Sequence, residues 1–182
     1  VVVAHSNFLS EATRLANFRV LNDGVKAIVV TPEQIYNDFS SGAQDISAIR
    51  DFLKHLRDNG NPLKYVLMFG GASYDYKDRI TDNSNYVPAY ISFQSTSLDD
   101  SYVTDDYFAM LDDTDVILNV VSEPDSYIEY STQMDIAIGR MPAHSLTEAK
   151  LMVDKTLAYY EKLSGQGTSL GEWKTKFLLV VD

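Results

Sequence analysis

The sequence predicts an α/β fold, in which three layers form as helices flank a mainly parallel sheet. Short apolar runs alternate with helical patterns over about the first 70 residues, an order typical of right-handed βαβ units. The apolar run at residues 65–69 is continuous and closes on Gly70-Gly71, as expected for a strand covered on both faces. Ligands bind beyond the carboxyl ends of strands in such sheets, so we expect the functional site near these glycines.

The elements of the first half follow from local signals. Apolar runs at residues 1–4 and 25–30 predict strands on either side of a helix at about residues 8–22. Thr31 as N-cap and Pro32 at the first helical position predict a short helix that Ser40-Ser41-Gly42 ends. A second helix is expected over residues 45–58. The apolar stripes of the two longer helices comprise Leu9, Ala12, Ala16 and Val20 in the first, and Ile46, Ile49, Phe52, Leu53 and Leu56 in the second.

The character changes between Ile80 and Gly139, where the sequence has no lysine, arginine or histidine. The segment carries a charge of −12, whereas the whole chain carries −11, so the remainder sums to +1. We therefore expect residues 80–135 to be an acidic, loop-rich insertion within a single α/β subdomain of residues 1–182. Short strands are candidates at residues 86–87, 107–111, 116–121 and 136–138. Its twelve acids are Asp82, Asp99, Asp100, Asp105, Asp106, Asp112, Asp113, Asp115, Glu123, Asp125, Glu129 and Asp135.

Regular patterns resume at residues 135–142, which predict a strand that ends at Pro142. Ser145 and Glu148 form a capping-box pattern that opens a helix to about Leu163. A loop at residues 164–169 and a strand at residues 177–181 follow. Because strands lie at both ends of the chain, we expect it to be part of a longer parent. The buried face of the last helix is expected to comprise Leu146, Ala149, Val153, Leu157 and Tyr160.

Composition limits the classes of function. The chain is 45% hydrophobic and 23% charged, which is typical of globular proteins. The net charge of −11 argues against nucleic-acid binding, which needs a basic face. No transmembrane segment or signal peptide is predicted. The chain contains no cysteine, so it offers neither a disulfide nor a thiolate nucleophile or ligand.

The densest acidic cluster is a candidate site for a structural calcium ion, because calcium prefers six to eight oxygen ligands. The spacing is not that of an EF-hand. A solvated acidic surface and a surface that attracts a basic peptide are the alternatives. The candidate ligands are Asp99, Asp100, Asp105, Asp106, Asp112, Asp113 and Asp115.

Other catalytic and binding patterns are weak. Gly70-Gly71 lacks the lysine and hydroxyl residue of a P-loop and the third glycine of a dinucleotide fingerprint, which leaves a tight exit from the sheet as its predicted role. The three histidines, His5, His55 and His144, show no metal-ligand spacing, and no serine lies in a nucleophile elbow. Arg140 is either an anchor for an anion or the partner of a nearby carboxylate.

Several blocks in order resemble the gingipain-type cysteine peptidases, and most closely the PorU-type sortases of the type IX secretion system. The blocks cover nearly the whole chain. They are residues 29–42 (VVTPEQIYNDFSSG), 45–52 (DISAIRDF), 64–75 (KYVLMFGGASYD), 86–88 (YVP), 104–108 (TDDYF) and 135–142 (DIAIGRMP).

This resemblance implies a caspase-like fold of two side-by-side subdomains, of which the chain matches the first. It implies that the catalytic histidine and cysteine belong to the second subdomain, so no catalytic residue is assigned here. It further implies a same-chain catalytic partner, polypeptide substrates, calcium binding, and a secreted or outer-membrane location at the cell surface. The alternative is a stand-alone acidic α/β module that binds a metal ion or a basic partner.

Overall fold

The computed structural model describes residues 1–60, 62–92, 101–113, 115 and 133–161. The strands predicted at residues 116–121 and 177–181 lie outside these residues, as does the loop predicted at residues 164–169. The elements are β1 (Val2–Ala4), η1 (Ser6–Phe8), α1 (Leu9–Asp23), β2 (Val29–Val30), α2 (Pro32–Phe39), α3 (Ile46–Asp58), β3 (Tyr65–Phe69), β4 (Tyr90–Ile91), β5 (Val103–Thr104), η2 (Asp106–Phe108), β6 (Ala137–Met141) and α4 (Leu146–Glu161).

A parallel sheet lies at the centre, with the strand order β2-β1-β3-β6. β3 pairs with β1 in the register Val2 to Leu67, and with β6 in the register Tyr65 to Ala137. The strand predicted at residues 65–69 is confirmed at both ends. Since β1, β3 and β6 run in the same direction, the residues that follow them meet at one edge of the sheet.

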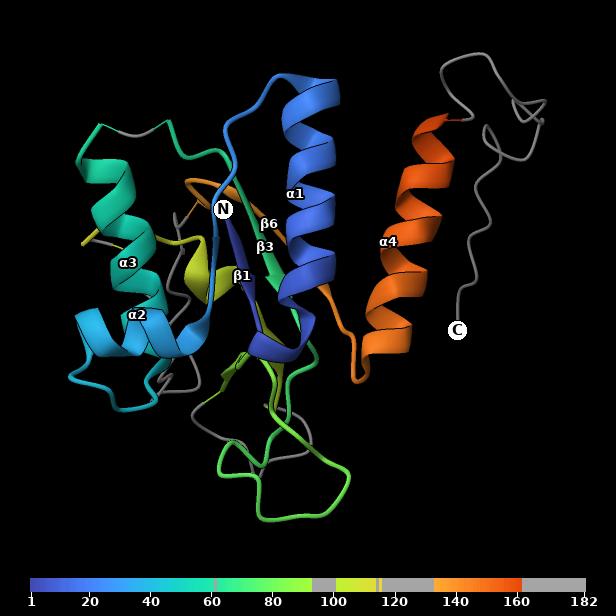
Figure 1. Cartoon of the computed structure of the whole chain (residues 1–182). Coiled ribbons are helices and arrows are strands. Elements are labelled where there is room, and N and C mark those ends of the chain that lie inside the picture. Colours follow the sequence, from blue (N-terminus) through green and yellow to red (C-terminus); the bar gives the residue numbers. More distant parts are fainter. Residues whose placement is uncertain (61, 93–100, 114, 116–132, 162–182) are drawn as a thin grey trace, which may run out of the picture.

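Helices cover both faces, which confirms the three-layer prediction (Figure 1). α1 and α4 pack on one face around buried Phe8, Phe69 and Val153. α2 and α3 pack on the other face, where Ile49, Leu53 and Met68 are fully buried. Two positions predicted to be buried, Val20 and Leu146, are exposed, because they lie near the ends of their helices, beyond the sheet.

Local capping explains where the helices begin. The Thr31 hydroxyl accepts a hydrogen bond from the Gln34 amide (3.2 Å), and the Gln34 side chain accepts one from the Thr31 amide (2.9 Å). This reciprocal pair is a capping box, and Pro32 occupies the first helical position as expected. Asp45 caps α3 through the Ser47 amide (2.8 Å). The Ser145 hydroxyl accepts from the Glu148 amide (3.2 Å) at the start of α4.

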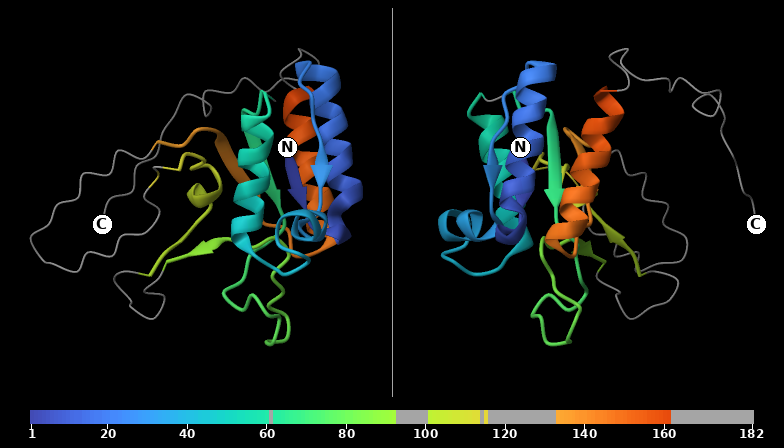
Figure 2. Two further views of the ribbon diagram at one scale, coloured as in Figure 1. Left: turned by 90° about the vertical axis from the view of Figure 1, so that its left-hand side faces the viewer. Right: turned by 45° about the vertical axis from the view of Figure 1, so that its right-hand side comes forward.

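The acidic segment is only partly extended. A two-stranded antiparallel ribbon of β4 and β5 lies beside the main sheet (Figure 2). The strand predicted at residues 86–87 is absent, and residues 106–108 form the 3-10 helix η2 where a strand was predicted. The second strand is shorter than predicted, since only Val29 and Val30 pair with β1. In the part of the chain that the structure describes, no helix has the length and apolar character needed to cross a bilayer.

Candidate functional site

The carboxyl edge of the sheet is built from the segments that follow β1, β3 and β6. Their backbones continue side by side after the strands end: the Gly70 amide donates to Met141 O (2.9 Å), and the Gly71 amide donates to Ala143 O (2.9 Å). On the other side, the His5 amide donates to Phe69 O (3.2 Å). These bonds hold the ends of the three strands as one rigid floor, in the place where the sequence predicts the functional site.

Both glycines at the end of β3 are required by close approach. Gly70 has φ +151°, and a Cβ atom there would lie 2.9 Å from side-chain atoms of Tyr86 and Val87. A Cβ atom on Gly71 would lie 2.6 Å from Nε2 of His144, because the imidazole ring rests on the glycine. The predicted tight exit from the sheet is therefore confirmed.

Two imidazoles flank Tyr86 at this edge. The His5 ring packs edge-on against the Tyr86 ring, with centroids 5.0 Å apart and an interplanar angle of 85°. The His144 ring also packs edge-on against Tyr86, with centroids 6.0 Å apart and an interplanar angle of 73°. The Tyr86 hydroxyl donates to His144 O (2.8 Å). The backbone N–H of Asn7 donates to Nδ1 of His5 (3.2 Å), so the neutral ring carries its proton on Nε2. Burial lowers the pKa of His5, and the negative charge of Glu33 partly opposes this effect.

The spacing of the three histidines in the sequence does not reveal that His5 and His144 share a neighbour, Tyr86. A signal was present, because each follows a parallel strand of the same sheet almost directly. His55 lies elsewhere, on α3, where its ring contacts Phe39 and the Asn59 amide group.

Arg140 cross-links the carboxyl edge of the sheet through five hydrogen bonds, which we call the Arg140 clamp. It projects from β6, and its five N–H groups meet five acceptors. Two of its donors reach the Asp105 carboxylate (2.6 and 2.9 Å), and the others reach backbone oxygens of Gly70 (2.7 Å), Val87 (2.7 Å) and Pro88 (3.0 Å). Since all donors are used, Arg140 is the partner of a carboxylate and not an anchor for a free anion.

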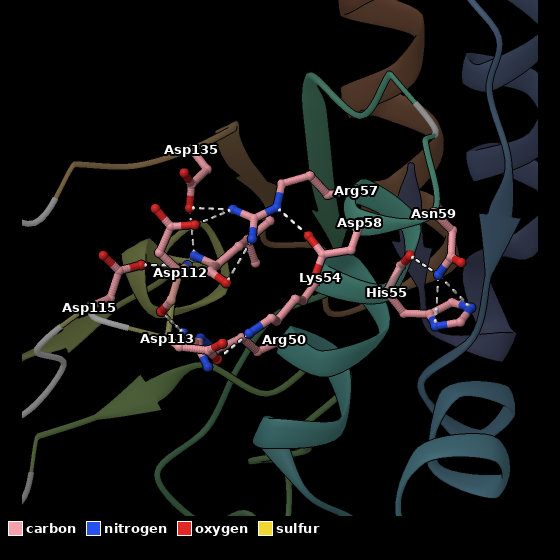
Figure 3. Close-up of polar contacts among 11 residues, drawn as sticks. Arg50, Lys54, His55, Arg57, Asp58, Asn59, Asp112, Asp113, Asp115 and Asp135 are labelled. Atoms are coloured by element: carbon pink, nitrogen blue, oxygen red, sulfur yellow. Dashed lines mark hydrogen bonds and ion pairs between the residues drawn. The ribbon is translucent and has the colours of Figure 1, made fainter.

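Basic residues of α3 neutralise much of the remaining described acidic segment (Figure 3). Arg57 pairs with Asp112 (2.9 Å) and Asp135 (3.1 Å), and Lys54 pairs with Asp113. The hydrogen bond from Lys54 lowers the pKa of Asp113. These pairs join α3 to residues about 55–80 positions away, so they act as structural cross-links.

Arg50, one turn before Lys54 on the same helix, directs its hydrogen bonds to backbone oxygens. It donates to Met110 O (2.5 Å) and to Asp112 O (3.0 Å). Burying one face of α3 against the acidic segment in this way satisfies carbonyls that no strand or helix uses.

The predicted calcium ligands do not converge within the described residues. Asp105, Asp112 and Asp113 are in ion pairs, and Asp115 accepts from the Asp112 amide (2.8 Å), whereas Asp106 is exposed. Within the described ranges, no group of three or more His, Asp or Glu side chains has the arrangement to hold a metal ion. Asp99 and Asp100 lie outside the described residues, so the calcium site stays a prediction.

The chemistry available at the carboxyl edge is binding and positioning. Imidazole N–H groups, a tyrosine and closely held backbone are present, but the chain has no cysteine to serve as a thiolate nucleophile.

Two solved structures have a fold similar to that of this chain. A crystal structure of dimeric latent PorU from Porphyromonas gingivalis superposes with a TM-score of 0.69 and 30% identity, covering 97% of this chain and 16% of the PorU chain. A complex of the pro- and mature domains of RgpB from the same organism superposes with a TM-score of 0.55 and 19% identity, covering 87% of this chain and 28% of that one. The second likeness shows the fold alone.

The chain thus spans less than a third of the length of each of these two proteins. No curated protein sequence matches it. The family model described as peptidase family C25 matches residues 1–182, the entire sequence. The chain belongs to peptidase family C25, the gingipain-like cysteine peptidases.

Proposed function

We propose that this chain is the N-terminal, non-catalytic subdomain of a gingipain-like cysteine peptidase. The observation that carries the proposal is a mismatch: the C25 family model covers all 182 residues, yet the chain has no cysteine. A cysteine peptidase needs a thiolate and an imidazole that activates it. A second subdomain of the same parent chain would supply both groups.

The parent would be a PorU-type sortase that removes C-terminal sorting signals from exported proteins of type IX secretion. The support is the 30% identity to PorU over 97% of this chain. A thioester intermediate would link cleavage to transfer of the exported protein onto a surface anchor. The parent would accordingly be secreted or located on the outer membrane at the cell surface.

The subdomain would buttress the catalytic half and shape its substrate groove. Within the described sheet, β6 is an edge strand that pairs on one side with β3. A further strand of the parent can join this edge, which would bring its carboxyl end beside Arg140 and His144. In that arrangement the rigid floor described above would form one wall of the groove.

A paired assay tests the proposal. The purified chain should cleave no peptide, whereas the parent protein should cleave one and should lose that activity on treatment with iodoacetamide. Peptidase activity in the chain alone, or a parent indifferent to alkylation, would refute it. The alternative of a stand-alone acidic module predicts a parent gene with no histidine and cysteine following this region.

We also propose that the acidic segment binds a structural calcium ion, with Asp99 and Asp100 among its ligands. Asp106 is exposed, and the bond from the Asp112 amide to Asp115 engages one carboxylate oxygen, so other oxygens of these residues are available for such an ion. An ion that binds the folded state alone must raise the melting temperature as its concentration rises. A calcium titration that leaves the melting temperature unchanged, with magnesium as control, would remove calcium from the account.

A further inference from the structure

His5 lies between β1 and η1, at the carboxyl edge of the sheet. Its imidazole is the N-cap of η1, because Nδ1 accepts a hydrogen bond from the Asn7 N–H (3.2 Å). We propose that His5 is a pH-sensitive latch, which holds the start of η1 and Tyr86 in place while its ring is neutral and releases both when the ring is protonated. This latch is a property of the chain itself and does not rest on the proposed function.

The presence of histidine at this cap makes the cap sensitive to pH. Serine, threonine, aspartate and asparagine are the usual N-cap residues, and their oxygen atoms accept a hydrogen bond throughout the physiological pH range. Histidine accepts only through an unprotonated ring nitrogen, and both nitrogens are donors in the imidazolium form. A proton on Nδ1 of His5 would face the N–H of Asn7, so protonation must break the cap.

The backbone of His5 is held on both sides. Its N–H donates to Phe69 O (3.2 Å), and its carbonyl oxygen accepts from the Phe8 N–H (2.8 Å). Because the backbone is fixed to β3 and to η1, the charged ring can leave the Asn7 N–H only by rotating about its side-chain bonds. The same rotation changes the contact between His5 and Tyr86.

The surroundings of the ring favour this rotation once the ring is charged. His5 is half-buried, and its ring contacts those of Phe8 (centroids 5.8 Å apart) and Tyr86 (5.0 Å apart). Phe8 is fully buried and also packs against Tyr86, with centroids 5.0 Å apart. Burial among these rings lowers the pKa of His5, because it disfavours the charged form. The imidazolium therefore gains hydration when it leaves this position.

Tyr86 carries the effect across the carboxyl edge. Its N–H donates to Gly71 O (3.0 Å), and its hydroxyl donates to His144 O (2.8 Å). His5 follows β1 and His144 follows β6, so Tyr86 joins the ends of two strands that are not neighbours in the sheet. Release of the His5 ring removes one of the three rings that pack against Tyr86, and this loosens the edge where the chain returns to the sheet.

The charged and titratable groups around His5 determine the pH at which the latch opens. From α2, the negative charge of Glu33 raises the pKa of His5 and partly opposes the effect of burial. On the side of the sheet edge, Tyr86 contacts the ring directly, and His144 contacts Tyr86. Because the net shift lowers the pKa below the ordinary 6.5, the closed latch resists protonation and the open one does not. The latch should therefore begin to open as the pH drops below 6.5.

Hydrogen exchange of the purified chain, followed by mass spectrometry, tests the proposal. Exchange is measured between about pH 7.5 and about pH 5 for peptides covering residues 6–12 and 82–90. Each rate is divided by that of an unstructured peptide of the same sequence at the same pH, which gives a protection factor. His5→Asn retains an oxygen that can cap η1 at every pH, whereas His5→Ala removes the cap at every pH. The α3 peptide, residues 46–58, and the variant His55→Gln are the controls.

In the unaltered chain, protection of both segments should fall by about fivefold as the pH drops, which corresponds to the loss of one hydrogen bond. His5→Asn should keep its protection at the lower pH, and His5→Ala should be weakly protected at both. Glu33→Gln should shift the fall to lower pH, because it removes the charge that raises the pKa of His5. His55→Gln should behave as the unaltered chain, and α3 should stay protected throughout.

The proposal is overturned if the unaltered chain keeps its protection at the lower pH, or if His5→Asn loses protection to the same extent. Equal loss in α3 also overturns it, because the change would then be global unfolding. A further variant, His144→Gln, identifies the titrating group: if it abolishes the pH dependence while His5→Asn does not, the group is His144 and the latch is refuted. A response in residues 6–12 without one in residues 82–90 refutes the coupling to Tyr86. Circular dichroism checks folding, and if His5→Ala does not fold, His5→Asn still decides.

Discussion

Shortening Asp105 to alanine tests how far the carboxyl edge depends on the Arg140 clamp. The pair is nearly buried, since the side chains are 14% and 18% exposed. Asp105→Ala leaves the guanidinium bonded to three backbone oxygens without a counter-charge. Removing one partner of a buried ion pair costs about 3 kcal/mol or more, because the remaining charge stays desolvated.

The chain contains a matched control at the same distance. Arg14 and Asp154 also lie 2.6 Å apart, but their side chains are 38% and 37% exposed. Arg14 keeps a second partner in Glu11 (2.7 Å) when Asp154 is shortened. Water can solvate what remains, so Asp154→Ala should change stability little.

Urea unfolding of the chain, followed by far-ultraviolet circular dichroism, measures both effects. With a slope of about 2 kcal/mol/M, the loss expected for Asp105→Ala lowers the midpoint by about 1.5 M. Added salt should leave this difference in place, because buried pairs are weakly screened. Equal midpoints for Asp105→Ala and Asp154→Ala would refute the reasoning that burial makes loss of the Arg140–Asp105 pair more destabilising than loss of the exposed Arg14–Asp154 pair.

Three other substitutions test single features by the same unfolding assay. Gly70→Ala should lower the free energy of unfolding by about 3 kcal/mol, because backbone strain and overlap with Tyr86 and Val87 add together. Gly60 has φ +78° with open space around it, so Gly60→Ala should cost only about 1 kcal/mol, and equal costs would contradict the close approach of Tyr86 and Val87 to Gly70. Thr31→Ala should cost about 1 kcal/mol by removing the cap of α2, and Thr31→Ser should restore most of it. Burial lowers the pKa of His5 in the folded state below its ordinary 6.5, so between the folded and unfolded pKa the unfolded state binds more protons, and the free energy of unfolding should fall as pH drops through about 6.5. His5→Asn should flatten this dependence of stability on pH, and an unchanged dependence would show that another group causes it.

Local rules predicted the elements whose signals are local. The run at residues 65–69 is a strand because it is apolar and ends on glycines, and nothing distant needs to be known. The starts of α2 and α3 depend on a hydroxyl or carboxylate that binds an amide two or three residues ahead, as at Thr31 and Asp45.

The strand predicted at residues 107–111 shows why the rest was beyond such rules. Its apolar residues are indeed buried, since Phe108 and Leu111 are fully enclosed. The Phe108 amide donates to the local Asp105 O (3.0 Å), whereas the backbone of Leu111 is satisfied by distant side chains: Arg57 donates to Leu111 O (3.1 Å), and Asp135 accepts from the Leu111 amide (2.7 Å). A tertiary contact thus replaces the strand partner that the pattern implied, and only the fold reveals it.

The acidic segment shows the same limit for charge. The sequence displayed a surplus of carboxylates and left three interpretations open. The cations that neutralise several of them, Lys54 and Arg57, lie on α3 with Arg50, at a spacing that puts all three on one helical face. That face was visible in the sequence. The segment that it contacts was not visible, because the two segments are more than 50 residues apart in the sequence and meet only in the folded chain.

Strand order explains why one arginine can control the candidate site. Because β6 comes late in the sequence but pairs next to β3, Arg140 can reach both the end of β3 at Gly70 and the chain at Val87, where the loop of residues 72–85 returns to the sheet. Under the proposed function, the catalytic half would join beyond β6, so Arg140 would lie between the reacting groups and this loop. Loss of the Arg140 hydrogen bonds would then shift the carboxyl edge relative to the reacting groups. Asp105→Ala should therefore reduce peptide cleavage by the parent even without urea and at temperatures at which the variant is fully folded.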